Sequence, residues 1–382
     1  MCLLGIGKVI TFSIVSVKMS LKHLTTAQVI RNADEIFHGI RWKYGIVVCP
    51  YCGSVHIKDY GKYDYRCRDC RKKFTDRTNT LMHGSKLSVA VWMQAIYEMM
   101  VDNFVSSIVL AKKLGINRKS AWLLQTKLRY SMAMDRWLLE GVIAQDEMYV
   151  GGSLSNYHYS RKWDLLRKGH YIAGDEKRYS KQALFQLNSD LKQPVFGMTN
   201  GDNVVLYATP NPIKSDYIKH VYRKHVSGDS VTVADESKLY NGWEREIGKI
   251  YLNNHHENQY VTKDGYTSNP IENKFSWYKR GFGGRITHCK YHQFYLNEYC
   301  FRYNTRTMTT EERFETLVGS TIGTRVTYKT IRKYKPYGEF KVKRNNNFTI
   351  EEIKHILSMG HVASLEQDGR VYTRTDMLNH LF

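Results

Sequence analysis

The chain has 382 residues, with 57 Lys and Arg against 36 Asp and Glu, so its formal charge is +21 at pH 7. A hydrophobic fraction of 42% excludes a disordered tail, and 27 glycines with 6 prolines exclude a collagen-like or proline-rich chain. At roughly 150 residues per domain, this length predicts two or three domains. The positive charge favours nucleic acid as the partner, although composition alone also fits a basic protein that binds none.

Cysteine usage and the N-terminus indicate an intracellular protein with no membrane partner. The seven cysteines are an odd number, and no convincing export signal precedes them, which favours a reducing compartment. That compartment is the cytoplasm or nucleoid of a bacterial cell, or the nucleus of a eukaryotic one. Residues 1–18 are apolar, but Lys8 interrupts them and they are too short to span a bilayer. We interpret them as a non-native or disordered extension, with a short membrane anchor as the alternative.

Residues 19–80 are predicted to hold a zinc ribbon preceded by a helix, with strands of the ribbon at 63–66 and 72–75. Two CxxC pairs, separated by residues 53–66, supply the four thiolates typical of one tetrahedral structural zinc ion: Cys49, Cys52, Cys67 and Cys70. A redox-active CxxC is the alternative, which two pairs at ligand spacing disfavour. Basic side chains crowd the second pair and suit contacts with DNA phosphates: Arg66, Arg68, Arg71, Lys72, Lys73 and Arg77.

Residues 85–137 are predicted to form a helical DNA-binding segment. Residues 105–129 have the pattern of a helix, a turn at 114–116 and a second helix capped near Asn117. A helix-turn-helix of this kind would set its second helix, with Arg118, Lys119 and Lys127, in a major groove of DNA. An ordinary helical hairpin that only packs into a core is the alternative.

Residues 141–306 have the element order of a ribonuclease H-like α/β domain. Runs of β-branched and aromatic residues predict strands at 142–150, 194–200, 203–209 and 230–235. Helical spacing of apolar residues predicts helices at 212–226, 270–280 and 290–304. Other mixed α/β folds share this order, so order alone does not decide between them. Together with the ribbon and the helical segment, it predicts a multidomain α+β protein.

Three acidic residues lie on these elements. Asp146 is within the first strand, Asp235 ends the fourth, and Glu272 begins a helix. In a ribonuclease H-like sheet these positions converge, and their oxygens can hold two magnesium or manganese ions. Glu147 adjoins Asp146, but consecutive strand residues face opposite sides of a sheet. We therefore expect only Asp146 of this pair to face the metals.

Five sequence blocks resemble the transposases of the ISXO2-like insertion sequences, relatives of the eukaryotic Merlin elements. In chain order they are CPYCGS with CRDCRKKFTDRTNT, QDEMYVGG, GDSVTVADESKLYNGW, TSNPIENKFSWYKRGFGG and YLNEYCFRYNTR, and together they cover roughly residues 35–306. The resemblance implies a metal-dependent DNA transposase of the DDE type. Such an enzyme cuts DNA at the ends of its element and joins the freed 3′-hydroxyls to target DNA.

The resemblance also implies roles for individual residues. Asp146 and Asp235 would be the first two metal ligands. The family carries asparagine or glutamate at the third position, so both Asn269 and Glu272 are candidates. We favour Glu272, because a carboxylate is the better magnesium ligand and Lys279 follows two turns later on the same helix face. Lys279, with Arg280 beside it in sequence, is then expected to hold a DNA phosphate.

Two segments depart from the family pattern. Residues 153–193 are a Tyr-, Lys- and Arg-rich insertion that suits contact with the DNA backbone, and residues 307–382 are a C-terminal extension of unknown role. Glu298 and Arg302 match the family's late glutamate-arginine pair. Because they lie four residues apart on a predicted helix, a structural ion pair is at least as fitting as a catalytic role.

Three functions fit these features. The first is a transposase that acts on double-stranded DNA, both terminal repeats and target, as a homodimer or higher assembly, since two element ends need two active sites. The second is a non-enzymatic, sequence-specific DNA-binding regulator with a degenerate nuclease-like domain, which has no need of the three acids together. The third is a nuclease of the same fold that hydrolyses DNA but never joins strands.

Overall fold

The computed structural model describes residues 25–43, 45–102, 104–133, 137–151, 158, 160–161, 164, 192–253, 265–282, 290–334, 364–367 and 370–373. The chain packs as two compact units, and the division falls within helix α5 (Arg118–Ser131). The first unit comprises Met1–Ala121, Thr309–Arg325 and Lys343–Phe382, and the second Trp122–Met308 and Val326–Val342. The interpretation of residues 1–18 and most of the predicted insertion at 153–193 lie outside the described residues. None of the helices described is both long and apolar enough to cross a membrane.

The first unit combines a small antiparallel sheet with a group of helices. The sheet has the order β1-β2-β3, with β1 at Ile57–Asp59, β2 at Asp64–Cys67 and β3 at Lys73–Thr75. The helices are α1 (Thr26–Arg31), α2 (Ala33–Arg41), α3 (Val89–Val101), α4 (Ser107–Leu114), the start of α5 (Arg118–Ser131) and α12 (Thr310–Ser320). β2 and β3 match the strands expected beside the second cysteine pair. β1 is a further, three-residue strand that the sequence analysis did not predict.

Polar side chains at the helix starts explain where several of these helices begin. The Thr25 and Thr309 hydroxyls accept hydrogen bonds from the amides of Gln28 and Glu312, whose side chains accept in return from the cap amides. Each reciprocal pair satisfies two amides that have no partner within the helix. Ser88 and Ser106 are single caps, and each hydroxyl satisfies one such amide at the start of α3 and α4.

A buried aspartate ties α2 to the small sheet. Asp76, 4% exposed, accepts hydrogen bonds from Trp42 Nε1 at 2.7 Å and pairs with His38 Nδ1 at 2.8 Å. Arg41 donates to the backbone oxygens of Asp76 and Thr78. Because a buried carboxylate without partners is costly, these contacts fix the helix against the turn that follows β3.

The segment 309–325 returns to the first unit, although the sequence assigned it no role. α12 packs against α2 and α3, with Tyr97 and Phe314 edge to face at 6.3 Å. Beyond α12, the Leu81 amide donates to the Thr321 carbonyl at 3.0 Å, and the Gly323 amide donates to the Asn79 carbonyl at 2.9 Å. The first unit is therefore built from segments far apart in sequence.

The second unit is organised around a mixed five-stranded sheet with the order β6-β5-β4-β7-β8. β4 is parallel to β7, and β7 to β8, whereas β5 is antiparallel to both β4 and β6. The strands are β4 (Val142–Val150), β5 (Gln193–Thr199), β6 (Val204–Ala208), β7 (Val231–Asp235) and β8 (Ile250–Asn253). Four of them lie within about two residues of the predicted bounds. The short β8 was not predicted.

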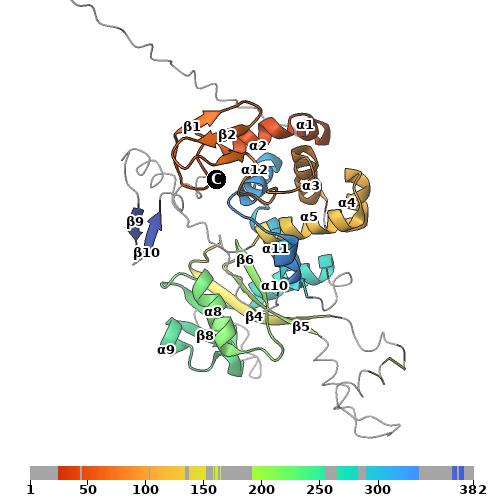
Figure 1. The fold of residues 1–382 in the computed structure, drawn as a ribbon. Coiled ribbons are helices and arrows are strands. Elements are labelled where there is room, and N and C mark those ends of the chain that lie inside the picture. The colour runs from red at the N-terminus through yellow and green to blue at the C-terminus, as the bar shows by residue number, and fades with distance from the viewer. Residues whose placement is uncertain are drawn as a thin grey trace, which may run out of the picture. The chain divides into compact units, whose positions relative to one another are not determined.

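Helices connect and cover this sheet. α8 (Ser215–His225) links β6 to β7, and α10 packs on β4 and β5 while α11 packs on β6 (Figure 1). The remaining elements are η3 (Lys238–Tyr240), α9 (Glu244–Ile247), α10 (Asn269–Phe282), α11 (His292–Asn304) and α13 (Tyr328–Arg332). In the first unit, a separate two-stranded sheet pairs β9 (Ser364–Gln367) with β10 (Arg370–Thr373). The α+β content and the mixed sheet are consistent with a ribonuclease H-like DDE domain.

A buried charge triad joins α5 to α11 within the second unit. Glu298, whose side chain is fully buried, accepts from Arg129 Nε at 2.7 Å and from Arg302 Nη2 at 3.1 Å. Asn297 Nδ2 also donates to the Arg129 carbonyl at 3.2 Å. The two guanidinium groups thus satisfy both oxygens of the carboxylate. This geometry explains the Glu298–Arg302 spacing as structural support.

Replacing Glu298 with alanine should destabilise the second unit. Removal of one partner from a buried ion pair leaves the other charge uncompensated and costs about 3 to 5 kcal/mol. We expect the thermal midpoint of Glu298→Ala to fall by roughly 10 °C, measured by circular dichroism. The control is Glu140→Ala, which removes an exposed carboxylate of the same unit. Equal midpoints for the two variants would contradict the support role of Glu298.

Candidate functional site

The register of two parallel strands aligns the two predicted aspartates. β4 and β7 pair from Val142 with Val231 to Ala144 with Val233. Continued by two residues, this register places Asp146 beside Asp235. On its other side Asp146 pairs with Gly197 of β5. The two carboxylates therefore come from neighbouring strands at the point where the β4–β7 pairing ends.

Asp146, Glu147 and Asp235 form the acidic cluster. Each offers a carboxylate oxygen, and these oxygens all lie within 4.8 Å of one another. The Glu147 amide donates to Asp146 Oδ1 at 2.6 Å, and the Tyr240 hydroxyl of η3 donates to Glu147 Oε1. The expectation that only Asp146 would face the metals is thus corrected. Strict alternation holds in a continuous ladder, but here the β4–β7 pairing stops and Tyr240 holds the longer Glu147 side chain.

Glu272 lies close to this cluster without being one of its three members. It is in the first turn of α10, is exposed, and accepts a hydrogen bond from Ser268 Oγ at 3.4 Å. Its charge nevertheless raises the pKa of Asp146, whereas that of Lys279 lowers it. Asn269, the other candidate third ligand, is also exposed and is the first residue of α10. One helix therefore carries both candidates and Lys279.

A glycine allows α10 to approach the sheet. A Cβ atom built on Gly197 would lie 2.7 Å from Phe275 Cζ and 2.8 Å from Leu206 Cδ2. Such distances are shorter than carbon contacts allow. Phe275 is itself 4% exposed and sits one turn beyond Glu272. The absence of a side chain opposite Asp146 thus lets the helix that carries Glu272 lie against β5.

Burial and mutual repulsion make the cluster reluctant to ionise. Desolvation, followed by the charges of Asp235 and Glu272, raises the pKa of Asp146 to about 7. Desolvation likewise raises the pKa of Glu147 to about 8, although the hydrogen bond from Tyr240 opposes the shift. A divalent cation would remove both penalties, because it supplies the compensating charge. Carboxylate oxygens are the ligands that magnesium and manganese prefer, so the cluster fits these ions.

The four cysteines form a second cluster, of different chemistry. Their sulfur atoms all lie within 4.8 Å of one another, with Cys49 and Cys70 at 3.6 Å and Cys52 and Cys67 also at 3.6 Å. Thiolates bound tetrahedrally at the usual zinc–sulfur length of about 2.3 Å would lie about 3.8 Å apart. The arrangement therefore fits a zinc ion.

Each cysteine pair closes a tight turn. The residue after each pair, Gly53 or Arg71, has a positive φ, of 74° and 60° respectively. The Cys70 amide donates to Cys67 Sγ at 3.4 Å. Burial alone would raise the pKa of Cys67, but hydrogen bonds led by that of the Cys70 amide lower it to about 7. Backbone amides thus prepare this sulfur to bind a metal as a thiolate.

The predicted basic residues fall into two groups. Most are exposed, and Lys72 also places its ammonium 4.8 Å from the Tyr51 ring centre. Lys127 is only 8% exposed, and burial lowers its pKa. Its prediction as a DNA contact is corrected, because it lies on the packed face of α5. The exposed residues are Arg66, Arg68, Arg71, Lys72, Lys73, Arg118, Lys119, Lys279 and Arg280.

The turn between α4 and α5 is the one that the sequence predicts. Gly115 ends α4 with a φ of 64°, and the Ile116 amide donates to the Ala111 carbonyl at 3.1 Å. Asn117 Oδ1 then accepts from the Ser120 amide at 2.8 Å and caps α5. Arg118 and Lys119, both exposed, stand directly after this cap. The first turn of α5 therefore presents two cations and free amide groups to solvent.

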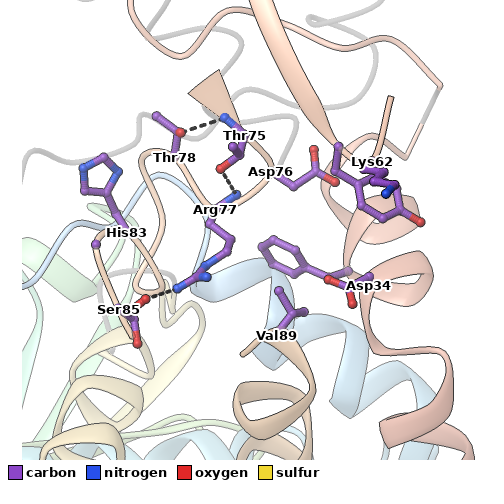
Figure 2. A pocket seen from close by; sticks show the side chains of 12 residues that line it. Asp34, Lys62, Thr75, Asp76, Arg77, Thr78, His83, Ser85 and Val89 are labelled. Atoms are coloured by element: carbon purple, nitrogen blue, oxygen red, sulfur yellow. Dashed lines mark hydrogen bonds between the residues drawn. The ribbon is translucent and has the colours of Figure 1, made fainter. Parts of the chain in front are cut away.

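The first unit also contains a cavity of about 390 Å³, which the sequence does not predict. Figure 2 shows Arg77 reaching from the turn after β3 to Ser85, to whose carbonyl it donates. Burial, followed by the charges of Arg325 and Arg77, lowers the pKa of His83 in the lining. The residues that line the cavity come from α2, the β1–β2 turn and residues 75–89, so no local motif in the sequence predicts the cavity. Of the residues predicted to contact DNA phosphates, Arg77 lines this cavity, where it is half-buried and donates to the Met82 and Ser85 carbonyls.

Removal of zinc should unfold the ribbon. Because the three strands near the cysteines bury few apolar side chains, their folding free energy depends on the metal. We expect about one zinc per chain by mass spectrometry of metals, and loss of both zinc and ribbon structure in Cys67→Ser. The control is Cys300→Ser, which removes a buried thiol outside the cluster. Full zinc content in Cys67→Ser would contradict the assignment.

The acidic cluster should make stability fall as pH rises. The folded-state pKa of Asp146, about 7, exceeds its usual 3.8, so the folded chain holds a proton that the unfolded chain loses first. The stabilisation is complete below pH 3.8 and is lost as pH rises through about 7. Without divalent metal, Asp146→Asn should therefore melt above wild type at pH 8, and the gain should shrink at pH 5.5.

Magnesium should reverse this pattern at the same site. We expect magnesium to raise the wild-type melting temperature at pH 8 and to do little at pH 5.5, where protons compete for the carboxylates. Asp229→Asn, an exposed aspartate in the turn before β7, serves as the control and should follow wild type. If the melting temperature of Asp146→Asn followed that of wild type at both pH values, repulsion within the acidic cluster would not be the cause of the pH dependence.

Comparison with known proteins supports the predicted resemblance. Residues 138–304 match the ISXO2-like transposase domain. An uncharacterised protein in transposable element ISH50 of Halobacterium salinarum is 30% identical over 154 residues, which make up 38% of this chain and 52% of that protein. The chain thus spans about half the length of this relative. No solved structure matches the chain. The chain therefore carries an ISXO2-like DDE transposase domain and is a distant homologue of the ISH50 protein.

Proposed function

We propose that the chain is a DNA transposase, which binds the ends of its mobile element, cleaves the DNA and transfers the cut strand to target DNA. The observation that carries this proposal is the cluster of Asp146, Glu147 and Asp235 within a domain of the ISXO2-like family. A DNA-binding regulator gains nothing from half-buried carboxylates that repel one another. A phosphodiester-cleaving site needs them, because they concentrate divalent cations.

In this proposal each acidic residue has a distinct role. Asp146 and Asp235, one residue on each of two neighbouring strands, hold the metal ions between them. Glu272 completes the ligand set from α10, with Asn269 as the alternative from the same helix turn. Two magnesium or manganese ions bound there would activate the attacking oxygen and stabilise the leaving oxygen. Glu147, held by Tyr240, adds a third negative charge to the cluster.

Exposed cations would hold the DNA. Lys279 lies two turns beyond Glu272 on α10 and is placed to contact a phosphate beside the carboxylates. The zinc ribbon and the start of α5 add further exposed cations, which suit contacts with the terminal repeat. A formal charge of +21 favours association with DNA at low salt. We further propose a homodimer or higher assembly on the DNA, inside the cell, because two element ends require two active sites.

The test is cleavage and strand transfer on duplexes that carry the ends of the encoding element. Wild type, in magnesium, should nick these ends and join them to a labelled target duplex. Asp235→Asn keeps the side-chain shape but removes the charge, and it should retain end binding while both steps fall by at least about 100-fold, since even outer-shell metal partners cost that much. Asp229→Asn, an exposed aspartate in the turn before β7, is the control.

The products separate the rival functions. Cut ends without joined products in the presence of target DNA would identify a nuclease. Specific end binding without cleavage in any divalent metal would identify a DNA-binding regulator. Equal activity of Asp235→Asn and wild type would contradict the role of the carboxylate cluster.

A further inference from the structure

The outward surface of α10 runs from the acidic cluster to an exposed tryptophan. Ile271, Phe275 and Tyr278 are at most 4% exposed and form the buried face of the helix. The opposite arc is exposed and, at 100° per residue, passes in angular order through Glu272, Ser276, Arg280, Asn273 and Trp277. Trp277 lies roughly 140° around the helix from Glu272 and about 7.5 Å along its axis. One continuous polar strip thus links the two residues.

Trp277 contacts two neighbouring side chains and is still exposed to solvent. It is 47% exposed, and its ring meets Tyr303 of α11 edge to face at 6.0 Å. The Lys274 ammonium lies 5.9 Å from the Trp277 ring and 4.7 Å from the Tyr303 ring. The Arg306 guanidinium also lies 4.2 Å from the centre of the Tyr303 ring. The indole is therefore contacted by Tyr303 and Lys274, and about half of the residue's surface stays open to solvent.

The surroundings of Trp277 indicate what kind of molecule covers it. Among the described residues of α10 and α11, no other large apolar side chain is exposed. A protein interface normally surrounds such an anchor with further apolar area. Here the nearest exposed neighbours on the helix are Asn273 and Arg280, with Lys274 beside the ring. A flat aromatic ring among cations suits a nucleobase, which offers a π-surface next to a phosphate.

We propose that Trp277 is a stacking platform for an unpaired nucleobase of the DNA bound at the acidic cluster, with Arg280, which lies between Glu272 and Trp277 in angle around the helix, holding a phosphate. Bases within a duplex are stacked on each other and cannot present a surface to an indole. The nucleotide on Trp277 must therefore be unpaired, as a base in a single-stranded tail is, or one that is flipped out of the duplex. This inference rests on the proposed transposase function and adds a specificity that this function does not require.

The experiment measures binding of DNA without any cleavage. Two fluorescein-labelled probes are used in buffer free of magnesium and of chelator: a blunt 25-base-pair duplex of arbitrary sequence, and the same duplex with a four-nucleotide 3′ tail containing 2-aminopurine. Wild type should bind the tailed probe more tightly and quench the 2-aminopurine. Trp277→Ala should lose about tenfold in affinity for the tailed probe and lose the quenching, with blunt-duplex affinity within about twofold of wild type.

Two further variants guard against a trivial loss. Trp277→Phe keeps an aromatic ring and should retain most of the tail preference. Tyr328→Ala removes another exposed aromatic side chain of the second unit, 55% exposed in α13, and should behave as wild type. Thermal midpoints of all variants are measured alongside, so that an unfolded Trp277→Ala is recognised and the comparison then rests on Trp277→Phe and a Trp277→Leu variant.

The outcomes separate this inference from the function beneath it. Wild type that binds neither probe would overturn both. Wild type that binds both probes, with Trp277→Ala unchanged on each or weakened equally on each, would overturn the stacking role alone. Loss of self-association in Trp277→Ala, seen by analytical ultracentrifugation without a change in tailed-DNA affinity, would show that a second copy of the chain covers this surface instead.

Discussion

Repulsion among the carboxylates at the end of the β4–β7 pairing is the constraint on which the second unit depends. Asp146, Glu147 and Asp235 approach within 4.8 Å although each would be more stable apart. The strand register fixes Asp146 and Asp235, so neither can retreat. Gly197 admits Phe275 and so brings the charge of Glu272 close as well. The fold thus gives up stability at a site where either protonation or a bound metal cation relieves the repulsion.

The buried Glu298 shows how the same unit treats a carboxylate that has no chemistry to perform. Glu298 is fully buried, yet Arg129 and Arg302 satisfy both of its oxygens. At the acidic cluster the protein supplies a hydroxyl from Tyr240 and the more distant charge of Lys279. Glu298 is fully buried whereas the three cluster residues are half-buried, and the two environments differ above all in their counter-charges. This contrast separates a supporting acid from a reactive one within a single domain.

Local patterns in the sequence predicted what local forces determine. The β-branched run of β4, the CxxC spacing and the Gly115–Asn117 turn are each fixed by neighbouring residues, and each was predicted close to its observed position. The position of Glu147 was missed, because it depends on Tyr240, far along the chain. The burial of Lys127 was missed because helical spacing gives a face but not the partner that covers it. The return of α12 to the first unit has no local signal either.

The two candidate metal-binding clusters differ in their ligand chemistry. Soft sulfur ligands in the first unit select zinc, whereas the hard oxygens of the second favour magnesium or manganese. A cation at either site relieves strain that the fold creates, but with different consequences. Zinc compensates for a core too small to hold three short strands. A cation at the carboxylates neutralises charges that uncharged side chains at the same positions would not introduce. Since selection for stability alone would remove those charges, their retention beside an exposed, cation-flanked Trp277 argues that the second unit is shaped by what it binds.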